Sequence, residues 1–159
     1  NVYSFSGIIV LSSTVRKLQP DQILIDYPVE KERVQRREYF RVSIQRPIEI
    51  YYNDGYKDRA YKGNTIDISG GGVRFWTKEN LQVGFIANMV LHLTGFFTPY
   101  EPISANGRIL YTKNHDSRLT SKAGYISVIK FHEISQKHRQ LIMKTCFKLQ
   151  IEMRKKGVL

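Results

Sequence analysis

Residues 67–72 read Asp-Ile-Ser-Gly-Gly-Gly and join two runs of strand-forming residues, 61–68 and 73–76. Three consecutive glycines permit positive φ angles and a close approach to the backbone, so the segment predicts a tight turn between two strands. Taken alone it is most often only a turn, in which Asp67 or Ser69 caps backbone N–H groups. It also suits a ligand, because the Asp67 carboxylate can accept the two hydrogen bonds that the N1–H and N2–H2 edge of guanine offers.

Strand-like runs continue on both sides of this turn and are separated by turn-forming residues. About six short strands, without the alternation of strands and helices that marks a doubly wound sheet, predict an all-β domain built as a small closed or nearly closed barrel. The expected strands cover residues 40–52, 61–68, 73–76, 87–93, 103–111 and 124–131.

The C-terminal stretch predicts a single amphipathic helix over residues 136–156. No Gly or Pro interrupts it, Ser135 is a suitable N-cap, and Gly157 is a suitable stop. Apolar residues recur at helical spacing, with Cys146 among them, and we interpret the lysines between them as a solvated outer face.

The first 28 residues predict a separate and incomplete unit. Strand-like runs cover 3–12 and 22–27, with Pro20-Asp21 as the turn between them. Two strands cannot form a stable domain alone, so we interpret residues 1–28 as the last strands of a second β domain. The chain opens on Asn1, directly in strand-like sequence, and we expect it to be a fragment. Residues 29–36 are highly charged and are the expected linker.

Composition narrows the possible partners. The chain has 159 residues and 25 Lys+Arg against 14 Asp+Glu, which gives a formal net charge of +11 and predicts an anionic partner such as nucleic acid, nucleotide, phospholipid or an acidic protein. The longest apolar run, 8–11, is far too short to span a bilayer, and no signal peptide is evident. The single Cys146 excludes an internal disulfide and favours a reducing compartment.

A second chemical cluster precedes the first barrel strand and reads Gln35-Arg36-Arg37-Glu38-Tyr39-Phe40-Arg41. Guanidinium groups present planar, paired donors that match phosphate oxygens and the O6/N7 edge of guanine. Three arginines within six residues repel one another unless an anion gathers them. An arginine pair at the start of a strand is, by itself, a common surface feature.

Together the two clusters are more specific than either alone. Arg-x-x-x-Arg followed by Asp-x-Ser-x-x-Gly in a small all-β domain resembles the signature of the PilZ family, over about residues 36–156. The resemblance implies a six-stranded β-barrel with a C-terminal α-helix that acts as a bacterial receptor for cyclic di-GMP. The PilZ domain would cover 37–159, with the barrel to about 132 and the helix over about 136–156. The form of the arginine cluster looks like the flagellar-brake (YcgR-like) branch, in which a second β domain precedes PilZ.

The resemblance also implies roles for the arginines. Arg37 and Arg41 match the Arg-x-x-x-Arg motif and would hold phosphates and guanine Hoogsteen edges. Arg36 would contact a second ligand molecule when an intercalated dimer binds.

In the second motif, Asp67, Ser69 and Gly72 would bind the guanine and admit the ligand backbone. Gly70 and Gly71 fall at the free positions, where the family commonly has small residues, and we include them in the expected ligand site.

Signs of catalysis or of a metal site are poor. The four histidines show no ligand spacing, and there is no nucleophile elbow, P-loop or dinucleotide-binding glycine motif. We therefore expect no enzyme activity, no metal and no cofactor beyond the ligand cyclic di-GMP.

The leading functional hypothesis is an adaptor in which cyclic di-GMP clamps the arginine-rich linker onto the barrel, reorients the two domains and changes a surface for a protein partner. By resemblance the partner would be a flagellar stator or rotor component, with slower swimming as the outcome. The protein would be cytoplasmic, recruited to the flagellar basal body, without membrane insertion and without a nucleic-acid partner. The alternatives are a nucleic-acid-binding basic β-barrel and a PilZ regulator of exopolysaccharide synthesis.

Overall fold

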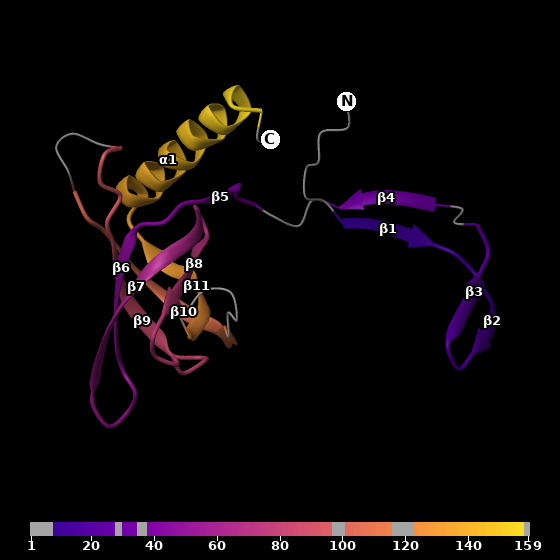
Figure 1. Ribbon diagram of the computed structural model, residues 1–159, viewed down its shortest axis with the longest axis horizontal. Helices are drawn as coiled ribbons and strands as arrows, with labels where there is room; N and C mark the ends of the chain where they lie inside the picture. Colours follow the sequence, from indigo (N-terminus) through magenta and orange to yellow (C-terminus); the bar gives the residue numbers. More distant parts are fainter. Residues whose placement is uncertain (1–7, 28–29, 35–37, 97–100, 116–122, 158–159) are drawn as a thin grey trace. The chain divides into compact units, whose positions relative to one another are not determined.

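The computed structural model describes residues 8–27, 30–34, 38–96, 101–115 and 123–157. The chain divides into two compact units, Asn1–Glu38 and Tyr39–Leu159, and each is described here by itself (Figure 1).

The first unit contains four short strands. They are β1 (Ile8–Ser12), β2 (Val15–Gln19), β3 (Gln22–Ile25) and β4 (Glu30–Val34). Strands β2 and β3 form an antiparallel hairpin with Gln19 opposite Gln22, so the turn is at Pro20-Asp21 as expected. Its first strand is β2, however, and not the run 3–12 that the sequence predicted.

The expected linker also differs from the structure. Residues 30–34 form β4, which pairs antiparallel with β1, with Ile8 opposite Val34 and Ser12 opposite Glu30. Strand pairing is made by backbone N–H and C=O groups, so a charged segment can join a sheet without any apolar alternation in its sequence. Both β2 and β4 were overlooked for this reason.

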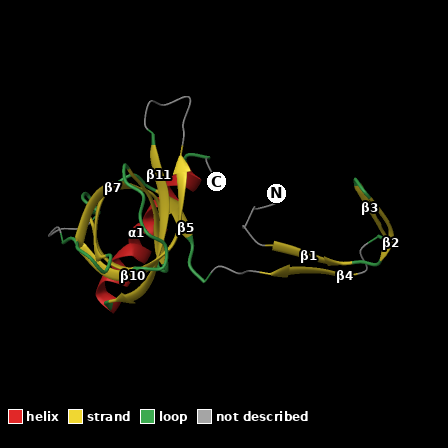
Figure 2. Ribbon diagram, turned by 90° about the horizontal axis from the view of Figure 1, so that it is seen from below, coloured by secondary structure: helices red, strands yellow, loops and turns green. Residues whose placement is uncertain are grey.

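The second unit is a closed antiparallel barrel with one helix. Its strands are β5 (Arg41–Ser43), β6 (Pro47–Asn53), β7 (Asp58–Ser69), β8 (Gly72–Thr77), β9 (Ile86–Leu91), β10 (Ile103–His115) and β11 (Gly124–Ile134). The hydrogen-bonded order is β5-β7-β6-β9-β10-β11-β8, and an additional pairing of β7 with β8 closes a ring of six strands (Figure 2). The prediction of a six-stranded barrel with a C-terminal helix is confirmed.

Strand β5 is a short addition to this ring, on the edge of β7 that also carries β6. The sequence predicted one strand over 40–52, but Ile44–Arg46 leave the ladder between the two pieces. Thr65 of β7 fills the interruption: its backbone N–H donates to the Arg46 carbonyl at 2.9 Å, and its hydroxyl oxygen accepts the Arg46 N–H at 2.9 Å. A side-chain bond from Thr65 thus supplements the backbone bonds where the regular ladder is interrupted.

The barrel interior is filled by aliphatic and aromatic side chains. Strand β6 shows the period-2 pattern directly, with alternate residues buried. The fully buried side chains include Ile48, Ile50, Ile68, Phe75, Met89, Leu91, Ile103, Ile109 and Ile129. Because every second residue points inward, the intervening residues are presented on the outer surface, where a ligand can meet them.

Helix α1 (Gln136–Lys155) lies over one end of the barrel and begins at Ser135, whose hydroxyl oxygen accepts the backbone N–H of His138 at 3.1 Å (Figure 1). Its inner face buries Ile142, Thr145 and Cys146, and the Cys146 thiol donates to the Ile68 carbonyl of β7 at 3.7 Å. Among the described residues, no helix has the length and apolar character needed to span a membrane.

Candidate ligand-binding site

The β7–β8 turn, residues 69–72, is a tight hairpin turn with Ser69 opposite Gly72. The Ser69 side chain is buried; its hydroxyl donates to the Gly72 carbonyl at 3.3 Å and accepts from the Gly71 N–H at 3.4 Å. The capping role that the sequence allowed for Ser69 is therefore present. A ligand that reached this hydroxyl would meet a group already held in place by the turn.

The glycines of this turn are needed for their size. None of the three has a positive φ. A Cβ on Gly72 would lie 2.5 Å from the backbone oxygen of Ile129, and a Cβ on Gly70 would lie 2.5 Å from the Tyr39 ring. The close approach that the sequence predicted is thus made in this structure by β11 and by Tyr39.

Arg41 is brought directly beside the turn. It lies in β5 opposite Ser69, and Val42 between Arg41 and Ser43 is buried, so Arg41 is on the outer face of the barrel. Part of each predicted motif therefore meets on one surface. Arg36 and Arg37, the other two predicted arginines, lie outside the described residues.

Asp67 is on the same outer surface and is paired with an arginine. It is the cross-strand partner of Arg74, and the Arg74 guanidinium lies 2.5 Å from the Asp67 Oδ2 atom. The Asp67 side chain is 13% exposed and that of Arg74 is 43% exposed, so the pair is at the surface and accessible from solvent. A guanine that used Asp67 would therefore have to share the carboxylate with Arg74 or displace it.

Sequence reasoning overlooked Arg74, although a signal was available. In a two-residue hairpin at Gly70-Gly71, Ser69 pairs with Gly72 and Asp67 pairs with Arg74. Residue 74 also lies between two inward-facing apolar residues, Val73 and Phe75, which assigns it to the outer face.

Two further residues, Tyr39 and Arg139, complete the surroundings of the turn. The Arg139 guanidinium, in the first turn of α1, donates to the Gly70 carbonyl at 2.9 Å and to the Tyr39 hydroxyl at 3.2 Å. It also lies over the Tyr39 ring, 5.6 Å from the centroid. Tyr39 stood inside the arginine-rich motif without being singled out, and no local signal connects Arg139 to it across 100 residues.

The arrangement is chemically suited to an anion that also carries N–H donors. Arg41, Arg74 and Arg139 come from three different elements around the same turn, and Asp67 lies among them. Guanidinium groups supply charge-assisted donors for phosphate, and a carboxylate supplies an acceptor for N–H groups. In the described part of the chain, no group of three or more His, Cys, Asp or Glu side chains is placed to hold a metal ion.

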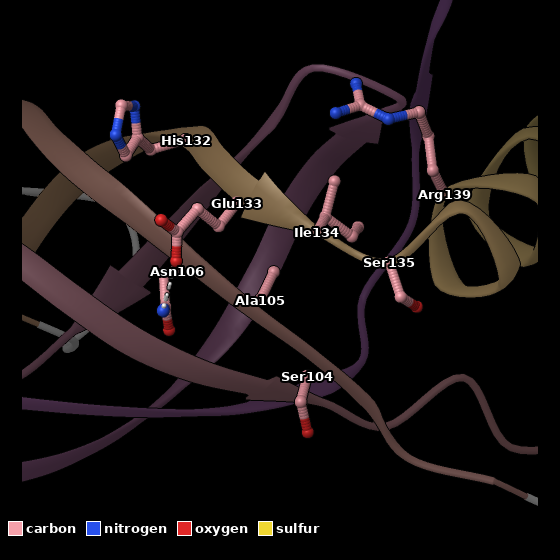
Figure 3. A pocket seen from close by; sticks show the side chains of 8 residues that line it. All are labelled: Ser104, Ala105, Asn106, His132, Glu133, Ile134, Ser135 and Arg139. Atoms are coloured by element: carbon pink, nitrogen blue, oxygen red, sulfur yellow. Dashed lines mark hydrogen bonds between the residues drawn. The ribbon is translucent and has the colours of Figure 1, made fainter.

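A pocket of about 440 Å³ lies next to this site, where α1 begins (Figure 3). Its wall comes from β10, β11 and the start of α1, and the Asn106 amide donates to a Glu133 carboxylate oxygen there at 3.1 Å. It contains none of the residues predicted for the ligand and adjoins the turn only through Arg139.

Comparison with known proteins assigns the family. The PilZ domain family matches residues 35–148, and the chain belongs to this family. An uncharacterized protein from Aquifex aeolicus (strain VF5) is 27% identical over 127 residues, which are 79% of this chain and 55% of that protein. The chain therefore spans about half the length of the curated relative that it matches.

Several solved structures share the fold at low sequence identity. The inhibitor of motility MotI/DgrA from Bacillus subtilis superposes with a TM-score of 0.73 at 18% identity, over 93% of this chain and 69% of that one. The PilZ domain of YcgR from Escherichia coli with c-di-GMP gives 0.60 at 17% identity, over 77% and 98%. The MrkH–c-di-GMP complex from K. pneumonia gives 0.61 at 21% identity, over 97% and 70%.

Proposed function

We propose that this chain is a cyclic di-GMP receptor whose ligand binds at the outer face of the barrel, around the β7–β8 turn. The observation that carries the proposal is the pairing of β5 with β7, which sets Arg41 opposite Ser69 and Ser43 opposite Asp67. Residues from two motifs that are well separated in the sequence thereby share one surface. The similarity to YcgR and MrkH, both solved with c-di-GMP, supports the same ligand.

The proposed roles of the site residues follow from the charges of their side chains. Arg41, with Arg37 from the preceding segment, binds the phosphates and the acceptor edge of guanine, because guanidinium donors match both. Arg36 contacts a second ligand molecule. Asp67 accepts from the donor edge of a guanine, and Ser69 and Gly70–Gly72 form the wall of the site. The receptor carries out no chemistry on the ligand.

The proposed output is a change in the arrangement of the two units that alters a surface for a protein partner. Ligand contacts with Arg36 and Arg37 would hold the segment that joins β4 to β5 against the barrel. The similarity to the motility inhibitor MotI and to YcgR favours a YcgR-like role with a flagellar stator or rotor component as the partner. Such a role places the protein in the cytoplasm, at the flagellar basal body.

Calorimetry with cyclic di-GMP tests the binding proposal. We expect Arg41→Ala to weaken binding by at least about 10-fold, equivalent to about 1.4 kcal/mol, because a charge-assisted contact is lost while the exposed site leaves folding intact. Arg154→Ala, at the exposed far end of α1, is the matched control and should bind as the parent chain does. Equal affinity of Arg41→Ala and the parent would refute the assignment of Arg41.

A second candidate is nucleic-acid binding, which the net charge of +11 favours. It predicts affinity for mixed oligonucleotides with a steep dependence on salt, and no competition by cyclic di-GMP at the turn. Filter binding of a labelled oligonucleotide, with cyclic di-GMP as competitor, separates the two functions. A regulator of exopolysaccharide synthesis would bind the same ligand and differ only in its protein partner.

A further inference from the structure

Three groups from distant parts of the chain meet beside the ligand turn: the Arg139 guanidinium, the Tyr39 ring and the Gly70 carbonyl. Arg139 donates to Gly70 at 2.9 Å and to the Tyr39 hydroxyl at 3.2 Å, and its guanidinium carbon lies 5.6 Å from the centre of the Tyr39 ring. We call these three residues the Arg139 clamp.

The three residues of the Arg139 clamp come from the two predicted motifs and from helix α1. Tyr39 lies between Arg37 and Arg41, inside the Arg-x-x-x-Arg motif, and Gly70 lies inside the Asp-x-Ser-x-x-Gly motif. The clamp therefore joins the interior of one motif to the interior of the other. Helix α1 supplies the arginine that does so.

Close packing accompanies the hydrogen bonds. The Tyr39 ring lies against both Gly70 and Gly71, and a Cβ placed on either glycine would come within 3.1 Å of a ring carbon. The glycines thus leave room for the ring, and the ring leaves Arg139 a flat surface and a hydroxyl to bind. A charged donor on a neutral carbonyl and a cation over an aromatic face are both favourable when partly desolvated, as Tyr39 and Arg139 are here.

We propose that Arg139 is a positioning residue for the ligand site: it holds the two motifs in their binding arrangement through Tyr39 and Gly70, without contacting the ligand. This inference rests on the proposed function. Its physical basis is preorganisation, because a ligand that must first bring two segments together spends binding free energy on ordering them. A site in which Arg139 already holds both segments avoids that loss.

The test compares cyclic di-GMP affinity among clamp variants. We expect Arg139→Ala to weaken binding by about 10-fold or more, and Arg139→Lys to restore only part of the loss because an ammonium group cannot stack flat on the Tyr39 ring as a guanidinium does. Tyr39→Phe keeps the ring and should weaken binding by less than Arg139→Ala does. Lys137→Ala, which removes an exposed lysine two residues before Arg139 that is paired with Glu101, is the matched control and should leave affinity unchanged.

Salt dependence distinguishes positioning from direct contact. Arg41→Ala should flatten the dependence of affinity on salt, because a charge that meets the ligand is lost. Arg139→Ala should weaken binding at every salt concentration and should reduce the slope less than Arg41→Ala does. A reduction in slope as large as that of Arg41→Ala would make Arg139 a ligand contact and would overturn the inference.

Other outcomes are equally decisive. Urea unfolding establishes the folded fraction of each variant, and if Arg139→Ala does not fold, Arg139→Lys and Tyr39→Phe supply the comparison. Parent-like affinity in folded Arg139→Ala, or in folded Arg139→Lys and Tyr39→Phe together, contradicts the clamp and leaves the proposed function standing. Absence of cyclic di-GMP binding by the parent chain contradicts the proposed function itself.

Discussion

Two aspartates of the barrel, Asp67 and Asp54, have different partners. Asp67 is paired with the surface arginine Arg74 near the β7–β8 turn. Asp54, in the loop between β6 and β7, accepts the backbone N–H groups of Lys57 at 2.9 Å and Tyr56 at 3.0 Å and binds Arg59. These hydrogen bonds, with the Lys57 N–H contributing most, lower the pKa of Asp54 from 3.8 to about 2.

The Asp54 pKa predicts an acid-sensitive hairpin. Because the folded-state pKa lies below the ordinary value, the carboxylate contributes stability that is complete above about pH 4 and is lost as the pH falls toward about 2. Urea unfolding at pH 5, 3 and 2 measures how far the free energy of unfolding falls with pH. In Asp54→Asn this fall should be smaller. Asp58→Asn, at an exposed neighbour, is the control; an unchanged decline in Asp54→Asn would contradict the prediction.

For single residues, the two motifs predicted which side chains lie near one another better than they predicted what these side chains touch. Arg41, Asp67 and Ser69 do share one surface, as the two motifs suggested. The hydroxyl of Ser69 is bound within the turn, Asp67 is paired with Arg74, and Arg139 comes from a helix far along the chain. Such pairings depend on strand register and helix placement, which composition and spacing do not contain.

Helix α1 is the element that connects the barrel core with the β7–β8 turn. Cys146 on its inner face is buried, and this burial raises the pKa of the thiol to about 12. The thiol is therefore protonated and shielded while α1 remains docked, and it becomes reactive only when the helix opens or the chain unfolds.

Alkylation of Cys146 should consequently report the docking of α1. We expect iodoacetamide to modify the folded chain roughly 100-fold more slowly than the urea-unfolded chain, with the rates followed by mass spectrometry. Ser135→Ala removes the N-cap, at a cost of about 1 kcal/mol, and should speed modification several-fold. Equal rates for folded and unfolded chains would show that the helix does not protect the thiol.

The strands were predicted unevenly, and the reason is physical. Barrel strands with alternating apolar residues, such as β6, were found because burial of one face imposes that alternation. The break between β5 and β6 was not found, since it depends on the Thr65 side chain of another strand. Strands β2 and β4 lack an apolar pattern, so only their backbone pairing identifies them.

The whole molecule carries an excess of positive charge, which should govern how fast an anionic ligand arrives. With a formal net charge of +11, long-range attraction would steer the proposed dianionic ligand toward the protein. Stopped-flow binding of cyclic di-GMP should show an association rate that falls about 10-fold between about 10 mM and 500 mM salt, while dissociation changes less. An association rate independent of salt would mean that steering plays no part.

Closure of the barrel has a consequence for how such a unit can be reused. Each of the six ring strands of the described barrel is paired on both sides. The three-residue strand β5, which is paired on one side, leaves only a short edge at which a strand from another chain could be added. A ring of this kind can be fused to unrelated neighbours without exchanging strands with them. Gene fusion can therefore place this barrel next to new neighbours, and each neighbour then needs only a tether to join it.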